Sequence, residues 1–412
     1  MSSINRPKPT QKQLDFLDWE FGAFFHFGLR AYYKGFQDWD ARDMDVKAFN
    51  PTELDCESWI REFKDAGATY AILVCKHHDG FANWPSKYTD YSVENTPWKD
   101  GKGDVVQEFV DACRRLDMKV GFYYSPAQRD WSKFKSDDDY DDYFIAQIGE
   151  LLQNYGKIDY LWFDGCGSED HEYNKNRIIK AIRTLQPEIL IFGMWDPDTK
   201  WIGNEGGWAP LPNFNTVSAL HFSMNATELD TKTLSNEKFL PGECDTDLRS
   251  TWFDCEDNEH TIYELEELMG LYYMSVGRGA NFLLNIGPDA RGLLPDPDVK
   301  RLREFGEEIR RRFGQHIDKF GAVAKKTDGK YEIKADRRTM VNHVIIKENL
   351  VDGESVTGFK LYSDDCLIYT GYNIGHKAIC MFPTVKTSTI KLEITTAIGE
   401  TVIDDMKAYF VK

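Results

Sequence analysis

The 412-residue chain carries 50 Lys and Arg residues against 68 Asp and Glu residues, a formal net charge of −18. An acidic chain of this kind repels phosphate backbones and anionic lipid, so neither nucleic acid nor the membrane surface is an expected partner. The length and the 42% hydrophobic content suit one large domain of roughly 250 to 330 residues followed by a smaller one.

Targeting and redox signals are weak. The first residues, MSSINRPKPTQKQ, lack the apolar segment of a secretory signal, and no run of about 18 apolar residues predicts a membrane-spanning helix. The eight cysteines are scattered without a CxxC pair, which predicts neither a zinc site nor a disulfide framework. We therefore expect a cytoplasmic protein with reduced thiols and no metal or cofactor, unless an export signal precedes this sequence.

Apolar strand candidates alternate with amphipathic helix candidates over the first three hundred residues. The helix candidate 104–116 places Val105, Phe109 and Cys113 on one stripe at helical spacing, and 176–185 has a similar pattern. The pattern favours a parallel sheet wrapped by helices, and the length favours a (β/α)₈ barrel over an open doubly wound sheet. No glycine-rich phosphate loop follows the first strand, which argues against a nucleotide-binding fold. The strand candidates are 21–28, 69–80, 118–125, 158–165, 188–194 and 279–289.

The pattern changes near residue 320. From residue 321 onward, short strand-like segments follow one another with turns every eight to twelve residues or so, and no helical stripe is present. This arrangement predicts a small antiparallel β-sandwich. We place the barrel domain at residues 1–320 and the β-sandwich at residues 321–412. The second domain could bind a ligand or cap the barrel, and capping is the favoured interpretation.

Polar residues stand where four of the strand candidates end. In a (β/α)₈ barrel these ends converge on one pocket. A single buried histidine is usually structural, but repetition at four successive ends favours a functional site. Asp164 closes the aromatic run IDYLWFDG, where an unpaired carboxylate would be costly to desolvate. The residues are His26, His77, His78, Tyr123 or Tyr124, and Asp164.

The composition of this pocket indicates the class of ligand. Several tryptophans and neutral hydrogen-bonding groups are available around it, together with carboxylates, but the sequence shows no basic cluster. Aromatic rings stack on the C–H faces of sugars, and His, Tyr and Asn bind sugar hydroxyls. A carbohydrate therefore fits better than a phosphorylated metabolite.

Several segments resemble the signature segments of family-29 glycoside hydrolases, the α-L-fucosidases. They are FGAFFHFG, VCKHHDGFANWPSKYTDYSV, GKGDVVQEFVDACRRLDMKVGFYYSP, LWFDG, WIGNEGG and NFLLNIGPDARG, in order from residue 21 to about 292. The resemblance implies a retaining hydrolase that releases fucose from a fucosylated glycan. It also implies a (β/α)₈-like barrel followed by a β-sandwich.

The resemblance assigns the catalytic carboxyl groups. A retaining glycosidase uses two of them about 5 to 5.5 Å apart, one as nucleophile and one as acid/base. By resemblance, Asp164 is the nucleophile. Glu205, in WIGNEGG, is the first choice for the acid/base, and Glu243, in PGECDTD, is the alternative.

The resemblance also implies a sugar-binding shell. Strand alternation allows only one residue of the pair Tyr123 and Tyr124 to face inward, and Tyr124 is our choice. The dipeptide Asp38–Trp39 stands where many family members have Glu–Trp. The shell comprises His26, Asp38, Trp39, His77, His78, Tyr124 and Trp162.

Two other functions fit parts of the pattern. Histidines and acids at barrel strand ends also describe metal-dependent sugar isomerases. Adjacent strand residues point to opposite sides, however, so His77 and His78 should be a poor chelating pair. The other alternative is a non-catalytic carbohydrate-binding protein that uses the C-terminal domain. Within the resembling family, the KHHDGF and WIGNEGG segments lean towards enzymes that cut α-1,3 and α-1,4 fucosyl linkages.

Overall fold

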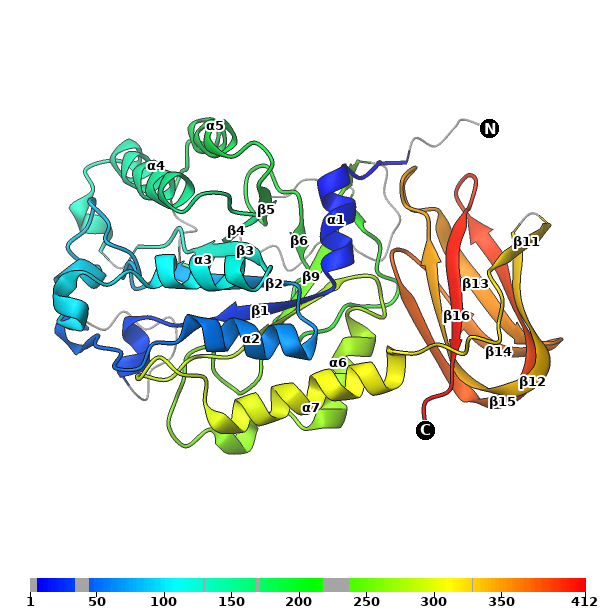
Figure 1. Ribbon diagram of the computed structural model, residues 1–412. Helices are drawn as coiled ribbons and strands as arrows, with labels where there is room; N and C mark the ends of the chain where they lie inside the picture. Colours follow the sequence, from blue (N-terminus) through cyan, green and yellow to red (C-terminus); the bar gives the residue numbers. More distant parts are fainter. Residues whose placement is uncertain (1–5, 34–43, 129, 168–170, 218–236, 328) are drawn as a thin grey trace.

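The computed structural model contains two adjoining parts, a barrel with surrounding helices and an antiparallel sheet (Figure 1). The first helix, α1, lies in the barrel part, and the last strand, β16, lies in the sheet. The structure describes residues 6–33, 44–128, 130–167, 171–217, 237–327 and 329–412.

Eight parallel strands form the barrel. Their order is β5-β4-β3-β2-β1-β10-β9-β6, and a bridge between Phe192 and Thr199 links the two outermost strands, so the barrel is nearly closed. This architecture confirms the predicted (β/α)₈-like fold. The strands are β1 (Phe21–Phe25), β2 (Tyr70–Lys76), β3 (Lys119–Tyr124), β4 (Tyr160–Phe163), β5 (Leu190–Phe192), β6 (Lys200–Trp201), β9 (Gly242–Asp247) and β10 (Asn281–Asn285).

Helices surround the barrel strands (Figure 1). Among the described residues, no helix lies between β5 and β6 or between β6 and β9, so the helical ring is incomplete there. None of the helices in the described ranges has the length and hydropathy needed to cross a membrane. The helices are α1 (Gln11–Trp19), α2 (Cys56–Ala66), α3 (Val105–Arg115), α4 (Asp137–Asn154), α5 (Lys175–Leu185), α6 (Leu265–Met274) and α7 (Asp296–Phe313).

Short elements occupy the connections. Six single-turn 3₁₀ helices and a two-stranded antiparallel ribbon, β7 with β8, are present in the described segments. They are η1 (Leu29–Tyr32), η2 (Val46–Ala48), η3 (Val93–Asn95), η4 (Trp98–Gly101), η5 (Trp131–Lys133), η6 (Glu259–Thr261), β7 (Thr216–Val217) and β8 (Lys238–Phe239).

Helix α3 shows how local sequence sets these elements. The carboxylate of Asp104 accepts a hydrogen bond from the backbone N–H of Gln107 at 2.9 Å and caps the first turn. The predicted stripe of Val105, Phe109 and Cys113 is fully buried. The helix therefore packs its apolar face against the barrel, as the spacing predicted.

Aromatic side chains fill much of the barrel interior. Phe16 of α1 meets Tyr160 edge-on with ring centroids 5.4 Å apart, so α1 closes the N-terminal end of the barrel. The interior side chains are Phe24, Tyr70, Ile72, Val74, Tyr123, Tyr160, Trp162, Leu190, Phe192 and Leu283. With that end closed, the C-terminal ends of the strands are left to form a site.

A buried carboxylate stands within this aromatic interior. Glu243, near the start of β9, accepts hydrogen bonds from the Tyr70 hydroxyl at 2.6 Å, the Trp162 indole N–H at 2.9 Å and the Tyr160 hydroxyl at 3.2 Å. Its side chain has no exposed surface. Burial raises the pKa of Glu243 to about 7, although the three hydrogen bonds act in the opposite direction.

The C-terminal part is one connected antiparallel sheet around its own core. Strands β12 and β15 are long, and their pairing shifts register between Lys334 and Thr339. The two halves of the predicted sandwich are therefore one connected sheet, and the long strands β12 and β15 run through both halves. The predicted domain boundary after residue 320 falls between α7 and β11. The strands are β11 (Ala324–Thr327), β12 (Lys330–Glu348), β13 (Val356–Ser363), β14 (Cys366–Gly371), β15 (Ala378–Ala397) and β16 (Ile403–Tyr409).

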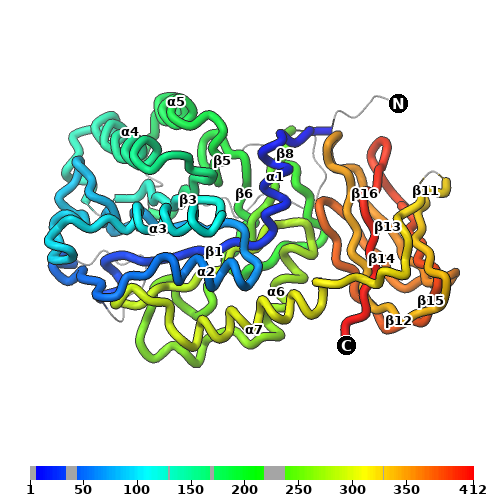
Figure 2. Tube along the Cα trace, in the orientation of Figure 1, coloured from blue at the N-terminus to red at the C-terminus, as the bar shows by residue number. Residues whose placement is uncertain are grey.

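The sheet packs against the N-terminal end of the barrel (Figures 1 and 2). Glu20, which directly precedes β1, forms an ion pair with Lys377, and Arg278, just before β10, bridges Ala378 of β15. Burial alone would raise the pKa of Glu20, but His376 and Lys377 lower it to about 2. The sheet thus lies at the barrel end opposite to the one that carries Asp164.

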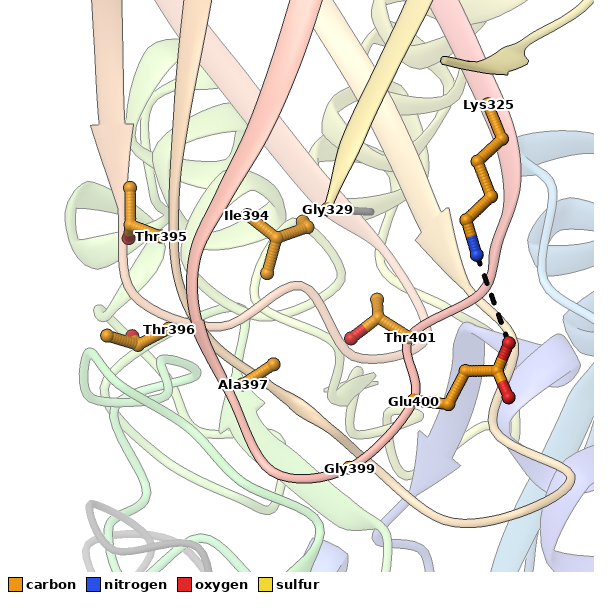
Figure 3. A pocket seen from close by; sticks show the side chains of 9 residues that line it. All are labelled: Lys325, Gly329, Ile394, Thr395, Thr396, Ala397, Gly399, Glu400 and Thr401. Atoms are coloured by element: carbon orange, nitrogen blue, oxygen red, sulfur yellow. Dashed lines mark ion pairs between the residues drawn. The ribbon is translucent and has the colours of Figure 1, made fainter. Parts of the chain in front are cut away.

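A pocket of about 480 Å³ opens in the C-terminal sheet (Figure 3). Threonines line much of it, and the ammonium group of Lys325 lies 3.9 Å from the carboxylate of Glu400. The described residues that line it include no aromatic side chain and none from the barrel. It therefore lacks the stacking surface expected of a sugar site.

The Glu243 carboxyl should make stability depend on pH. Because its pKa is raised from 4.5 to about 7, the folded protein holds a proton that the unfolded chain has released between these values. The stability that this proton confers is complete below about pH 4.5 and is lost as the pH rises through about 7. The loss amounts to about 3 kcal/mol at about 1.4 kcal/mol per pKa unit.

We expect the substitution Glu243→Gln to remove this pH dependence, because glutamine keeps a carbonyl acceptor and cannot ionise. In urea unfolding, the variant should gain about 3 kcal/mol relative to the parent between about pH 5 and about pH 8. The matched control is Glu400→Gln, whose parent side chain is 82% exposed. An equal shift in both variants would contradict the prediction.

Candidate active site

Asp164 directly follows β4 at the C-terminal end of the barrel. Its Oδ2 accepts a hydrogen bond from the Tyr123 hydroxyl at 2.7 Å, and its Oδ1 accepts one from the backbone N–H of Cys166 at 2.9 Å. The side chain remains 27% exposed. The carboxylate is therefore held by neighbouring groups and still reaches solvent.

His78 lies beside this carboxylate. Its Nε2 is 3.5 Å from Asp164 Oδ2, and its Nδ1 is 2.6 Å from the Ser125 hydroxyl oxygen. That oxygen also accepts the backbone N–H of Ala127 at 3.1 Å, so the serine proton can be donated to Nδ1. When Ser125 donates, the proton of the neutral ring lies on Nε2 and faces Asp164. Burial lowers the pKa of His78, and the charge of Asp164 opposes that effect.

His77 and His78 lie on the same side of the barrel mouth, contrary to our expectation. Strand β2 ends at Lys76, and its pairing with β3 shifts register just before that residue, so strand alternation does not extend to the histidines. Their ring centroids are 4.2 Å apart. His77 also stacks on Tyr123 at 5.8 Å, and burial holds its pKa well below the usual range.

The choice of Tyr124 over Tyr123 was wrong. Tyr123 belongs to the barrel interior and binds Asp164, whereas the Tyr124 hydroxyl donates to Gln147 of α4 at 2.7 Å. The buried ammonium group of Lys76 lies 4.4 Å from the centroid of the Tyr124 ring. Successive strand residues face opposite sides, so only Tyr123 can contact the site.

His26 follows β1 and lies under two aromatic side chains. The centroid of its ring is 5.0 Å from Trp252 and 5.4 Å from Phe253. Its Nδ1 is 2.8 Å from Oδ1 of Asn285, the last residue of β10. Burial lowers the pKa of His26 to about 3, so the ring is neutral near neutral pH.

Trp162 lies one layer below Asp164. Its indole stacks on Phe192, with centroids 4.1 Å apart, and on Tyr123 at 5.4 Å. Its N–H is donated to Glu243. The structure therefore places Trp162 in the wall of the barrel with 6% of its surface exposed. The predicted residues Asp38 and Trp39 lie outside the described residues.

Glu205 is exposed in a tight loop after β6. The side chain of Asn204 closes the loop, accepting the N–H of Gly206 at 3.0 Å and donating to the carbonyl of Trp208 at 3.1 Å. Asp245 of β9 is buried near this loop. Burial raises the pKa of Asp245 well above the usual range, and the charge of Glu205 adds to the effect.

The two candidate acid/base residues thus differ in access. Glu205 follows a strand at the C-terminal end of the barrel and is open to solvent. Glu243 is enclosed below Trp162. The raised pKa of Glu243 is that of a potential proton donor, but only Glu205 is exposed to solvent.

Three residues near the site were missing from our sequence assignment. Ser125 orients His78, Asn285 contacts His26, and Trp252 covers the His26 ring. Ser125 directly follows β3, and Asn285 is the last residue of β10. The rule that polar residues at strand ends form the site, which identified His26 and Asp164, could therefore have found them.

No group of three His, Cys, Asp or Glu side chains within the described ranges is arranged to hold a metal ion. The barrel mouth instead presents one carboxylate with a hydroxyl and a histidine beside it, and aromatic side chains nearby. Such a set can bind a neutral polyol and attack an electrophilic carbon.

Comparison with known proteins agrees with this description. The family model for α-L-fucosidase matches residues 3–312. Alpha-L-fucosidase 1 of Arabidopsis thaliana is 36% identical over 316 residues, which cover 73% of this chain and 60% of that protein. The chain therefore spans less than two thirds of that relative's length.

Two solved structures extend the likeness to the whole fold. A Bacteroides thetaiotaomicron protein, named provisionally as an α-L-fucosidase, is 30% identical with a TM-score of 0.91, and 99% of each chain is covered. A glycoside hydrolase 29 family member from an unknown rumen bacterium is 31% identical with a TM-score of 0.91, covering 99% of this chain and 78% of that one. The chain belongs to the α-L-fucosidase family, glycoside hydrolase family 29.

Proposed function

We propose that the protein is a retaining, exo-acting α-L-fucosidase that releases terminal L-fucose from fucosylated glycans through a covalent fucosyl intermediate. The observation that carries the proposal is the Asp164 carboxylate, held by Tyr123 at the open end of the barrel. Membership of a glycoside hydrolase family supports hydrolysis over the isomerase and carbohydrate-binding alternatives.

Two steps follow from this arrangement. Asp164 attacks the anomeric carbon, and the bond to the glycosidic oxygen breaks as Glu205 gives that oxygen a proton. Water then attacks the same carbon, Glu205 takes the water's proton, and Asp164 leaves as a carboxylate. Hydrogen bonds from Tyr123 and Cys166 stabilise the carboxylate before attack and after departure.

Neutral groups suit recognition of this sugar. Burial keeps His26 uncharged, so it can bind a hydroxyl without attracting anions. Fucose carries a methyl group in place of the usual hydroxymethyl group, and this methyl needs an apolar wall. Trp252 and Phe253, which cover His26, provide aromatic surface for it.

Substitution of Asp164 tests its role as the nucleophile. We expect Asp164→Asn to lose nearly all turnover without unfolding, because the covalent route requires the carboxylate. In the smaller variant Asp164→Ala, azide should restore part of the turnover and give a fucosyl azide of inverted configuration. The measurements are the initial rate on an aryl fucoside and the melting temperature. Activity above about a tenth of the parent kcat, a barrier change of only ~1.4 kcal/mol, would rule out Asp164 as nucleophile.

Substitution of Glu205 tests its role as the acid/base. Loss of a general acid matters most when the leaving group is poor, because a good leaving group departs as its anion. We therefore expect Glu205→Ala to lose far more activity on a natural fucosyl glycan than on a dinitrophenyl fucoside. Azide should rescue this variant with retained configuration, and its pH–rate profile should lose the basic limb.

Glu243→Gln is the matched control for Glu205→Ala. Because Glu243 is enclosed by Tyr70, Tyr160 and Trp162, its substitution should affect both substrates equally. If the leaving-group dependence appeared in the Glu243 variant and a uniform loss in the Glu205 variant, the acid/base would be Glu243.

The linkage preference is the finer part of the proposal. The KHHDGF and WIGNEGG segments favour cleavage of α-1,3 and α-1,4 fucosyl linkages in branched glycans. We expect higher kcat/KM on a Lewis-type trisaccharide than on 4-nitrophenyl α-L-fucoside. A strong preference for the aryl fucoside would contradict this linkage assignment and leave the hydrolase assignment intact.

A further inference from the structure

The side-chain amide of Asn285 has a single possible orientation. Its Oδ1 accepts the backbone N–H of His26 at 3.2 Å, and its Nδ2 donates to the backbone carbonyl of Trp252 at 2.7 Å. A backbone N–H can only donate and a backbone carbonyl can only accept. Exchanging the oxygen and nitrogen of the amide would put two donors, and two acceptors, face to face. The residue is 1% exposed, so water cannot relieve such a mismatch.

This orientation determines where the His26 proton resides. The ring atom Nδ1 is 2.8 Å from the same Oδ1, which can only accept. We infer that Asn285 is a positioning residue that fixes His26 in the Nδ1–H tautomer and leaves Nε2 as a hydrogen-bond acceptor for a sugar hydroxyl. The use of Nε2 by a sugar rests on the proposed function, whereas the tautomer does not.

The surroundings of His26 keep the ring in this neutral form. Phe24, Trp252 and Phe253 lie with ring centroids 4.5, 5.0 and 5.4 Å from it. Burial among these rings lowers the pKa of His26 to about 3, against the opposing influence of the Asn285 hydrogen bond and of Asp164. A proton on both ring nitrogens is therefore strongly disfavoured near neutral pH.

The inference gives neighbouring histidines opposite hydrogen-bonding roles. Nε2 of His78 lies 3.5 Å from the Asp164 carboxylate, which can only accept, and this favours a proton on Nε2. His26 presents an acceptor at Nε2. A hydroxyl bound at His26 must therefore donate its proton. Nε2 is thus an acceptor in His26 and a donor in His78.

The second hydrogen bond of Asn285 gives it a second positioning effect. Its Nδ2 holds the carbonyl of Trp252, and the Trp252 ring covers the His26 ring. The single amide of Asn285 thus positions both the His26 ring, whose Nε2 accepts a hydroxyl proton, and the aromatic ring of Trp252. Two substitutions separate these effects. Asn285→Asp keeps an acceptor for Nδ1–H and removes the donor to Trp252, while Asn285→Leu has a similar shape and removes both.

The tautomer can be measured without any substrate. In protein labelled with ¹⁵N-histidine, long-range ¹H–¹⁵N correlation distinguishes protonated from unprotonated ring nitrogens, and the His26 signals are those lost in His26→Gln. At about pH 8 we expect Nδ1–H in the parent and in Asn285→Asp. In Asn285→Leu we expect a mixture with Nε2–H. An Nε2–H tautomer in the parent would overturn the inference, as would an unchanged spectrum in folded Asn285→Leu.

Asn281→Leu is the matched control, since Asn281 is a buried amide at the other end of β10 that donates to the carbonyl of Phe16 at 2.8 Å. Its His26 signals should match the parent. In kinetics on an aryl fucoside, we expect Asn285→Leu to raise KM about tenfold. This factor is at the upper end of the range for loss of one neutral hydrogen bond between the sugar and His26. Asn285→Asp should raise KM less. An inactive parent with the Nδ1–H tautomer would refute the proposed function alone.

Discussion

The hydrogen bond between Tyr123 and Asp164 is the contact on which the site is built. It exists because β3 and β4 pair in parallel with Tyr123 opposite Trp162, which brings Asp164, two residues after Trp162, level with the tyrosine hydroxyl. A shift of one residue would turn Tyr123 outward and put Tyr124 in its place. The aromatic stack of Tyr123, Trp162 and Phe192 resists such a shift, since it would have to be taken apart.

The strands that sequence patterns could predict are those with apolar residues on both faces. Strand β9 was missed because the residues of its interior face, Glu243 and Asp245, are acidic, so GECDTD resembles a surface loop. The partners that bind these carboxylates come from strands far away in the chain, such as Tyr70 and Trp201. Burial of an acid is decided by such distant donors, and no local pattern reveals them.

The site was predictable to the level of strand ends. That rule brought His26, His78 and Asp164 to one end of the barrel, as the structure shows. It could not decide between Tyr123 and Tyr124, because the strand-end position does not say which of two successive residues of β3 faces the barrel interior. Strand alternation wrongly put His77 and His78 on opposite sides, because the change of pairing before Lys76 has no signature in the residue types.

The C-terminal sheet contacts the barrel at the end opposite to Asp164. Contacts of Glu20 and Arg278 with the sheet lie at the N-terminal end of the barrel, and the loops that border Asp164 lie at the other. Changes of loop length around the site therefore need not disturb the interface between the two parts. The segments at the open end of the barrel can therefore diverge in evolution while the ion pair of Glu20 with Lys377 and the strand bridge at Arg278 are inherited unchanged.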